Sequence, residues 1–177
     1  IGTDGTPNFA AAADILNRNA KAYQLYTNAP DKVSSQGLSM GVTYMMSKGY
    51  TIAGNGTYAH FNIENANPSN IAAFNTPKYS TNVTFGNSNA FNNFGFNLAW
   101  HWQDAFDWYG TFNGTRPGRI QAFSMVDLQF NKKIPSKNAS IKIGASNLLN
   151  NRVSQAYGSP TVGAIYYVAL TLDGVLK

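Results

Sequence analysis

Large apolar residues alternate with small or polar ones along most of the chain after Val33. In the clearest run, residues 94–104, every second residue is large and apolar: Phe94, Phe96, Leu98, Trp100 and Trp102. The residues between them are small or polar: Gly95, Asn97, Ala99, His101 and Gln103. Because successive side chains of a β-strand point to opposite faces, this pattern predicts strands with one apolar face and one polar face.

The same alternation predicts an all-β, antiparallel chain. We expect seven strands, at residues 33–46, 50–62, 79–86, 94–104, 119–133, 138–146 and 163–173. Turn-forming residues separate the strands, such as Ser47-Lys48-Gly49 in a short hairpin and the Asn-rich segment 87–93. Residues 1–32 are the least strand-like part, and we expect them to form a partly helical loop that Asn8 caps and Pro30 ends.

The connections between the predicted strands alternate between short and long. Outer-membrane β-barrels have this asymmetry, with short periplasmic turns and long extracellular loops. With the short connections placed in the periplasm, the aromatic residues of the apolar face fall into two belts. The extracellular belt holds Tyr58, Tyr79, Trp100, Trp102 and Tyr166, and the periplasmic belt holds Tyr44, Tyr50, Phe85, Phe94 and Phe130.

A transmembrane barrel explains this sorting better than a soluble β-sandwich does. A sandwich would also alternate, but it has no reason to sort aromatic residues by depth. The sequence therefore favours a barrel whose apolar face meets outer-membrane lipid, and it leaves a soluble sandwich that acts as a binding module as an alternative.

The composition agrees with a lipid-facing protein and excludes several other classes. Charged residues make up 12% of the chain and aromatic residues 14%, whereas about a quarter of an ordinary globular domain is charged. The formal net charge of +5 is scattered, so we expect no nucleic-acid partner. There are 0 cysteines, which excludes disulfides and thiolate metal sites, and no apolar run reaches the length of a membrane-spanning helix.

Five segments resemble the C-terminal barrel strands of TonB-dependent outer-membrane receptors, and in particular the SusC-like (RagA-like) branch of Bacteroidetes. They are NTPKYS (75–80), FGFNLAWHWQDAF (94–106), SMVDLQF (124–130), IGASNLLNN (143–151) and GAIYYVALTLD (163–173). The resemblance implies a barrel of about 22 strands, an N-terminal plug, a TonB box, and a SusD-like lipoprotein as a lid. It also implies energy from TonB and import of a nutrient such as an oligosaccharide or a peptide.

The chain contains only part of such a receptor. It has no plug or TonB box, and bacterial single-chain barrels have an even number of strands, so we expect residues 33–177 to be C-terminal strands of a larger barrel. The last strand should then pair with the first strand of that barrel, and no stretch before Val33 can be that strand. A small standalone barrel with a structural or adhesive role is the alternative.

Two groups of residues are candidates for function. The predicted extracellular loop between residues 104 and 118 concentrates aromatic and charged side chains, which suit either substrate contact or packing against another loop or a lid: Asp107, Trp108, Tyr109, Phe112 and Arg116. On the polar face, a tight turn with Lys133 opposite Asn138 would put Lys142 opposite Gln129 and diagonal to Asp127. We therefore expect an ion pair between Asp127 and Lys142, which would brace the lumen wall or contact substrate.

We expect no enzymatic activity, no cofactor and no metal site. His60 falls on the apolar face and His101 on the polar face, so the two histidines do not converge on one site. No nucleophile motif accompanies them.

Overall fold

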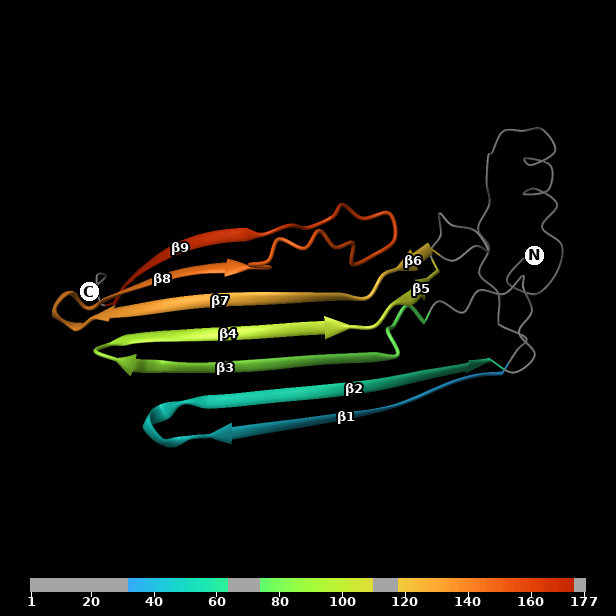
Figure 1. The fold of residues 1–177 in the computed structure, drawn as a ribbon, viewed down its shortest axis with the longest axis horizontal. Coiled ribbons are helices and arrows are strands. Elements are labelled where there is room, and N and C mark those ends of the chain that lie inside the picture. The colour runs from blue at the N-terminus through green and yellow to red at the C-terminus, as the bar shows by residue number, and fades with distance from the viewer. Residues whose placement is uncertain (1–31, 64–73, 110–117, 174–177) are drawn as a thin grey trace, which may run out of the picture.

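The computed structural model describes residues 32–63, 74–109 and 118–173. Its main element is one seven-stranded antiparallel sheet with the strand order β1-β2-β3-β4-β7-β8-β9 (Figure 1). The strands are β1 (Val33–Met45), β2 (Thr51–Ile63), β3 (Tyr79–Phe91), β4 (Phe94–Gln103), β7 (Phe123–Ile134), β8 (Ala139–Ser146) and β9 (Ile165–Leu172). A second, two-stranded sheet pairs β5 (Phe106–Trp108) with β6 (Gly118–Ile120).

The structure has one antiparallel sheet of seven strands, as the sequence predicts, with two larger differences in strand bounds and one additional short strand. The strand predicted to end at residue 86 continues to Phe91 through a bulge between Asn87 and Phe91. The strand predicted at residues 119–133 is two strands, β6 and β7, interrupted at Gln121 and Ala122. The short strand β5 lies in the predicted extracellular loop.

Three tight turns join neighbouring strands at one end of the sheet, which we name the turn end. They contain the 3-10 turns η1 (Ser47–Gly49) and η3 (Pro135–Lys137), and the pair Asn92–Asn93. Residues with positive φ close all three turns: Lys48 (60°), Gly49 (79°), Asn92 (44°), Asn93 (61°) and Asn138 (44°). Glycine and asparagine tolerate this conformation best, which is why they gather here.

The longer connections all lie at the opposite end, which we name the loop end (Figure 1). They join β2 to β3, β4 to β7 and β8 to β9. The predicted alternation of short and long connections is therefore confirmed.

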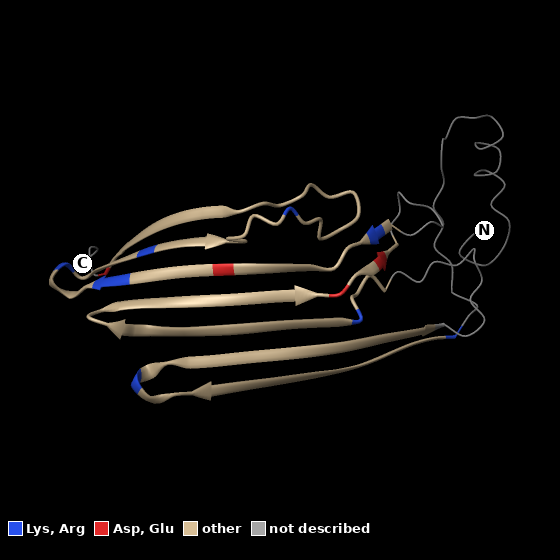
Figure 2. Ribbon diagram, in the orientation of Figure 1, with Lys and Arg blue, Asp and Glu red and all other residues tan. Residues whose placement is uncertain are grey.

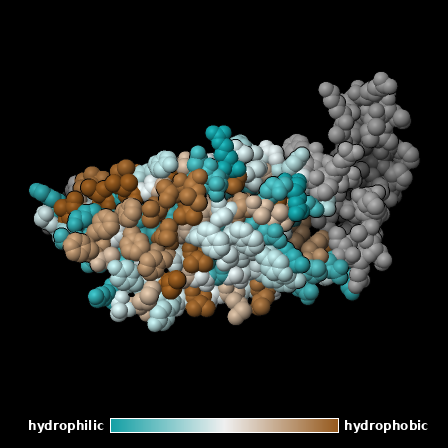
Figure 3. Space-filling view, viewed as in Figure 1, coloured by the Kyte–Doolittle hydropathy of each residue, from teal (hydrophilic) through white to brown (hydrophobic). Residues whose placement is uncertain are grey.

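Cross-strand pairing keeps the apolar residues of all seven strands on one face. Leu98, for example, pairs with Phe85 on one side and with Leu128 on the other. On the edge strand β1, Met40 is 68% and Val42 71% exposed, and on β9 Val168 is 73% exposed. Figure 3 shows a broad hydrophobic area over the strands, with hydrophilic side chains toward both ends.

No second layer covers this apolar face in the part of the chain that the structure describes. A soluble β-sandwich, the alternative left open by the sequence, would bury such a face against another sheet, whereas the described residues leave it exposed. The exposed apolar area requires a surrounding of similar polarity.

Aromatic rings on the apolar face cluster at two levels. At the turn end the ring of Phe85 lies 6.0 Å from that of Tyr50, and the ring of Phe94 lies 5.5 Å from that of Phe130. Toward the loop end the ring centroids of Tyr58 and Tyr79 are 5.4 Å apart. These six rings therefore group at the turn end and toward the loop end, as the sequence predicts for them.

Charged residues avoid the middle of the sheet. Lys48, Lys132, Lys133 and Lys137 lie in or beside the turns of the turn end. Toward the loop end lie Lys32, Lys78, Asp104, Asp107 and Arg119 (Figure 2). Asp127 on β7 is the one acidic residue within the described strands of the seven-stranded sheet.

The two outer strands of the sheet each have one neighbour. Within the described residues β1 pairs only with β2, and β9 pairs only with β8. Both edges therefore carry backbone groups that the described sheet leaves without partners. The described helices are too short to span a membrane.

Candidate functional site

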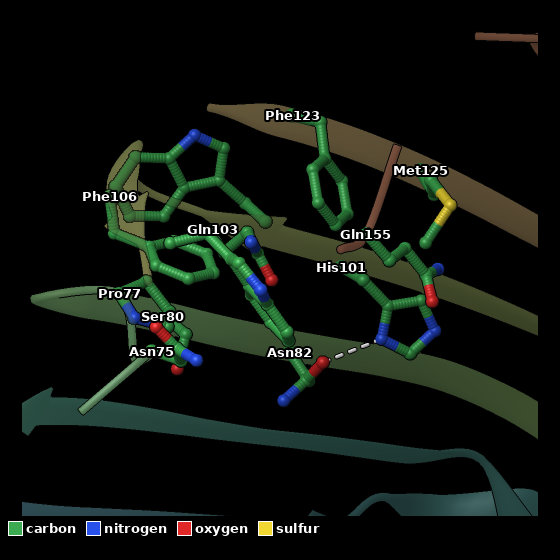
Figure 4. Close-up of a pocket in the computed structure, with 12 residues that line it drawn as sticks. Asn75, Pro77, Ser80, Asn82, His101, Gln103, Phe106, Phe123, Met125 and Gln155 are labelled. Carbon is green, nitrogen blue, oxygen red and sulfur yellow. Dashed lines mark hydrogen bonds between the residues drawn. The ribbon is translucent and has the colours of Figure 1, made fainter. Parts of the chain in front are cut away.

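A pocket of about 480 Å³ opens on the polar face near the loop end. Three strands contribute pairs of side chains to its wall: Ser80 and Asn82 from β3, His101 and Gln103 from β4, and Phe123 and Met125 from β7 (Figure 4). Asn75, Pro77, Trp102, Phe106, Trp108 and Gln155 complete the lining.

The sequence places these side chains together through strand periodicity. The members of each pair are two residues apart, so both point to the same face of the sheet. Pairing of Asn82 with His101, and of His101 with Met125, then aligns the three strands at this level. The polar side chains of β4, whose face the sequence predicts, therefore form one wall of the pocket.

A row of hydrogen-bonding side chains crosses five strands at the level of the pocket floor; we name it the polar row. It consists of Asn55, Asn82, His101, Asp127 and Ser146. Asn82 Nδ2 donates to Asn55 Oδ1 at 2.9 Å, and His101 Nδ1 lies 2.6 Å from Asn82 Oδ1. His101 Nε2 lies 3.3 Å from Asp127 Oδ2, and Ser146 Oγ donates to Asp127 Oδ1 at 3.0 Å.

The predicted ion pair between Asp127 and Lys142 is wrong. We expected a tight turn with Lys133 opposite Asn138, whereas the turn is wider and Lys133 pairs with Ser140. Lys142 therefore lies opposite Asn131, four residues along β7 from Asp127. His101, Ser146 and Asn147 are the partners of the carboxylate instead.

Asp127 also fixes the start of the β8–β9 connection. The backbone N–H of Asn147 donates to Asp127 Oδ1 at 2.8 Å. The Asn147 side chain is 2% exposed, donates to the carbonyls of Asn151 and Val162, and accepts the N–H of Asn151. These bonds hold the connection in a closed loop that brings Gln155 to the pocket.

The candidate residues of the extracellular loop are only partly at the pocket. Trp108 lines it, and Asp107 forms an ion pair with Arg119 at 2.9 Å between β5 and β6. Tyr109 is held through its backbone, because its N–H donates to Asn75 Oδ1 while Asn75 Nδ2 donates to its carbonyl. Phe112 and Arg116, like the predicted loop at residues 1–32 up to Asp31, lie outside the described residues.

Sequence reasoning missed Asn75, Asn147 and Gln155. The sequence did mark Asn147, because the run SNLLNN is rich in asparagine, which builds turns through its side-chain amide. In the structure Asn147 and Asn150 have positive φ, at 52° and 53°. No signal marked Gln155, because only the path of the loop brings it to the pocket.

The side chains of the pocket offer groups that can bind a ligand. Ser146 donates to Asp127 and not to His101, whose second nitrogen faces Asn82, so these groups do not have the order of a nucleophile, base and acid. Among the described residues there is no cluster of three or more His, Cys, Asp or Glu that could hold a metal ion. The amides, the hydroxyl of Ser80 and the aromatic rings can instead hydrogen-bond and stack with a ligand.

The single sheet, its lipid-compatible apolar face, its belts of aromatic rings and its polar opposite face define an outer-membrane β-barrel protein. The chain belongs to the outer membrane protein beta-barrel family, whose model matches residues 8–165. The protein is therefore located in the outer membrane, with the apolar face toward lipid and the polar face toward the lumen. No curated protein matches the chain.

Three solved structures share this fold. The ferric-catecholate import receptor Fiu from E. coli K12 is 11% identical, with a TM-score of 0.61, over 79% of this chain and 21% of the receptor. The ferric enterobactin receptor PfeA from Pseudomonas aeruginosa, in its G324V form, is 16% identical, with a TM-score of 0.57, over 78% and 22%. The siderophore receptor PiuA from Acinetobacter baumannii is 13% identical, with a TM-score of 0.57, over 79% and 21%.

This chain spans about a fifth of the length of each of these receptors. At these identities the likeness shows the fold alone. The described sheet is similar to part of each of these larger receptors.

Proposed function

We propose that this chain is the C-terminal barrel segment of a TonB-dependent outer-membrane transporter that imports a nutrient such as an oligosaccharide or a peptide. Substrate would enter from the loop end, the plug would move when TonB pulls on it, and residues 33–177 would form part of the lipid-sealed wall.

The observation that carries this proposal is the pair of open edges. In lipid, every backbone polar group needs a partner, so a sheet with an apolar face and two unpaired edges is not a stable end state. Seven strands closed on themselves would make an odd-numbered barrel, which bacterial single-chain barrels avoid. The simplest completion is a set of further strands between β9 and β1, supplied by the same polypeptide.

The finer assignments rest on the sequence resemblance. The five segments quoted above support a SusC-like receptor of the Bacteroidetes type, with a plug, TonB and a SusD-like lipoprotein as partners. In this proposal residues 1–32 form an extracellular loop, and the short turns face the periplasm.

The pocket gives the proposal a candidate substrate-contact surface. Trp108 belongs to it directly, whereas Asp107 and Tyr109 support the hairpin that carries Trp108. Phe112 and Arg116 remain part of the proposed contact surface on the strength of their sequence position. Asp127 acts beneath the pocket, through His101 and the β8–β9 connection.

A growth experiment tests the transport role. A strain that lacks this protein is grown on single oligosaccharide and peptide sources, beside the parent strain, the complemented strain and a strain without functional TonB. We expect a growth defect on at least one source, reversed by complementation and reproduced by loss of TonB. Uptake of that source at the parental rate in the TonB-deficient strain would contradict the proposal.

The barrel assignment is tested separately. Protein extracted from outer membranes should form a heat-modifiable barrel whose polypeptide is heavier than 19.2 kDa. A closed barrel made by a 19.2 kDa polypeptide alone would favour a small standalone barrel instead.

A further inference from the structure

The charge of the pocket follows from its lining. None of the twelve lining residues is Lys, Arg, Asp or Glu. Asp107 and Arg119, on the hairpin that carries Trp108, form an ion pair in which the two charges cancel. Within the described residues, the pocket wall therefore offers no counter-charge to an anionic ligand.

The floor of the pocket has a negative charge or none. His101 Nε2 lies 3.3 Å from Asp127 Oδ2. When the imidazole is neutral, the pair of side chains carries the −1 charge of the carboxylate; when the imidazole is protonated, the two charges cancel. In neither state is the floor positive.

Among the described residues, the side chains that line the pocket beside His101 add no further charge. The side chain that faces it from β3 is the neutral Asn82, β7 contributes Met125 and Asp127, and the β8–β9 connection contributes the neutral Gln155. Lys142 lies four residues along the strands from the level of Asp127, which is about 13 Å.

The walls above this floor suit a cation. Phe106, Trp108 and Phe123 line the pocket, and aromatic faces attract ammonium groups through their quadrupoles. Side-chain carbonyl groups of Asn82, Gln103 and Gln155 are acceptors that an N–H donor can use. Aromatic faces, neutral acceptors and a carboxylate behind them are the elements of an organic-cation site.

We propose that this pocket binds an organic cation, that is, a ligand with an ammonium group next to an apolar portion. The proposal rests on the proposed function, since it names the charge class of what the transporter would take. The carboxylate of Asp127 acts at a distance, through the field across His101, and the aromatic rings make the direct contact.

Three probes with one carbon skeleton and different charges test this inference: phenethylamine, phenethyl alcohol and phenylacetate. The intact outer-membrane protein that contains this chain is placed in nanodiscs of neutral phosphatidylcholine, and binding is measured by saturation-transfer NMR. Empty nanodiscs report partition of each probe into lipid.

At neutral pH we expect phenethylamine to bind about two- to fivefold more tightly than phenethyl alcohol, the range for a cation against aromatic faces at a wet site. Phenylacetate should bind more weakly than the alcohol.

Two variants test whether the charge of Asp127, and not any negative charge on the protein, causes the preference for the amine. Asp127→Asn removes the charge but keeps an acceptor oxygen for Ser146 and Asn147, so it should reduce the preference for the amine without weakening binding of the alcohol. Asp173→Asn removes one negative charge at the turn end and should change nothing.

Three results would overturn the inference: tightest binding of phenylacetate, no binding of any probe, or an amine preference that Asp127→Asn does not reduce. The purified protein needs no energy source, so these results are independent of transport. A TonB-dependent growth defect without an amine preference would leave the transport role intact and refute only the charge assignment.

Discussion

An arginine at Leu128 should destabilise the folded protein far more than an arginine at the adjacent Gln129. Leu128 lies on the apolar face of β7, paired with Leu98 and Ala145, whereas Gln129 points to the lumen. Both residues lie on β7 at nearly the same depth, so a difference between the two variants reports which face of the sheet carries the arginine.

The depth of Leu128 sets the magnitude. It lies six residues from Ile134, the last residue of β7, which is about 20 Å along the strand. With a strand tilt of about 40°, this is about 15 Å above the turn end, close to the middle of an apolar band about 25 Å tall. An arginine on the lipid face at that depth costs about 2–4 kcal/mol, a factor of about 30 to 900 in the folding equilibrium.

The assay is urea unfolding of the intact protein in phospholipid vesicles, with the folded fraction followed by heat-modifiable migration on gels. We expect Leu128→Arg to lose about 2–4 kcal/mol of the free energy of unfolding. Gln129→Arg should stay within about 0.5 kcal/mol of the parent, as surface substitutions do. Equal losses in the two variants, or a larger loss for Gln129→Arg, would refute the assignment of the apolar face to lipid.

Three further predictions concern turns, orientation and close strand contact. Asn93 has a φ of 61°, a conformation that a β-branched residue disfavours. Asn93→Val should therefore lower the free energy of unfolding by about 1–2 kcal/mol in urea titrations, whereas Asn93→Gly should not. An equal effect of the two substitutions would argue against this turn. The chain has 0 cysteines, so single cysteines introduced at Arg152 and Lys48 report the orientation in the membrane. A membrane-impermeant maleimide should label Arg152→Cys in whole cells and Lys48→Cys only after permeabilisation. The reverse labelling pattern would invert the proposed topology. A Cβ on Gly86 would lie 2.7 Å from the carbonyl oxygen of Phe96, whereas a Cβ on Gly56 would meet nothing within 4 Å. In the same titrations Gly86→Ala should therefore lower the free energy of unfolding by about 1–3 kcal/mol, and Gly56→Ala by less than about 1 kcal/mol. Equal losses would mean that β3 and β4 are not this close.

The faces of the strands could be predicted from the sequence because side-chain alternation is a local property. The strand register could not, and the β7–β8 hairpin shows why. We expected Lys133 opposite Asn138, but Asn138 adopts a left-handed conformation after η3 and Lys133 lies opposite Ser140. A shift of two residues leaves every side chain on its face, so the face of Asp127 was predicted correctly while its partner was not.

The pocket could be anticipated only in part. Alternation placed His101 on the lumen face, and composition drew attention to Trp108. Asn75 and Gln155 come from connections whose paths depend on long-range hydrogen bonds, such as those from Asn75 to the backbone of Tyr109. Three-residue strands such as β5 are also too short for an alternating pattern to be recognised.

The open edges of the sheet have a consequence for how this protein enters the membrane. On an edge strand about every second residue points its N–H and C=O away from the sheet, so β9, with eight residues, exposes about eight such groups. At several kcal/mol for each group left without a partner in lipid, one bare edge would cost tens of kcal/mol. In the proposed larger barrel, a partly assembled sheet therefore cannot persist in the bilayer before the remaining strands have joined it. Insertion and closure must proceed as one event, in which each new strand reaches a pairing partner or an assembly factor before its backbone meets hydrocarbon.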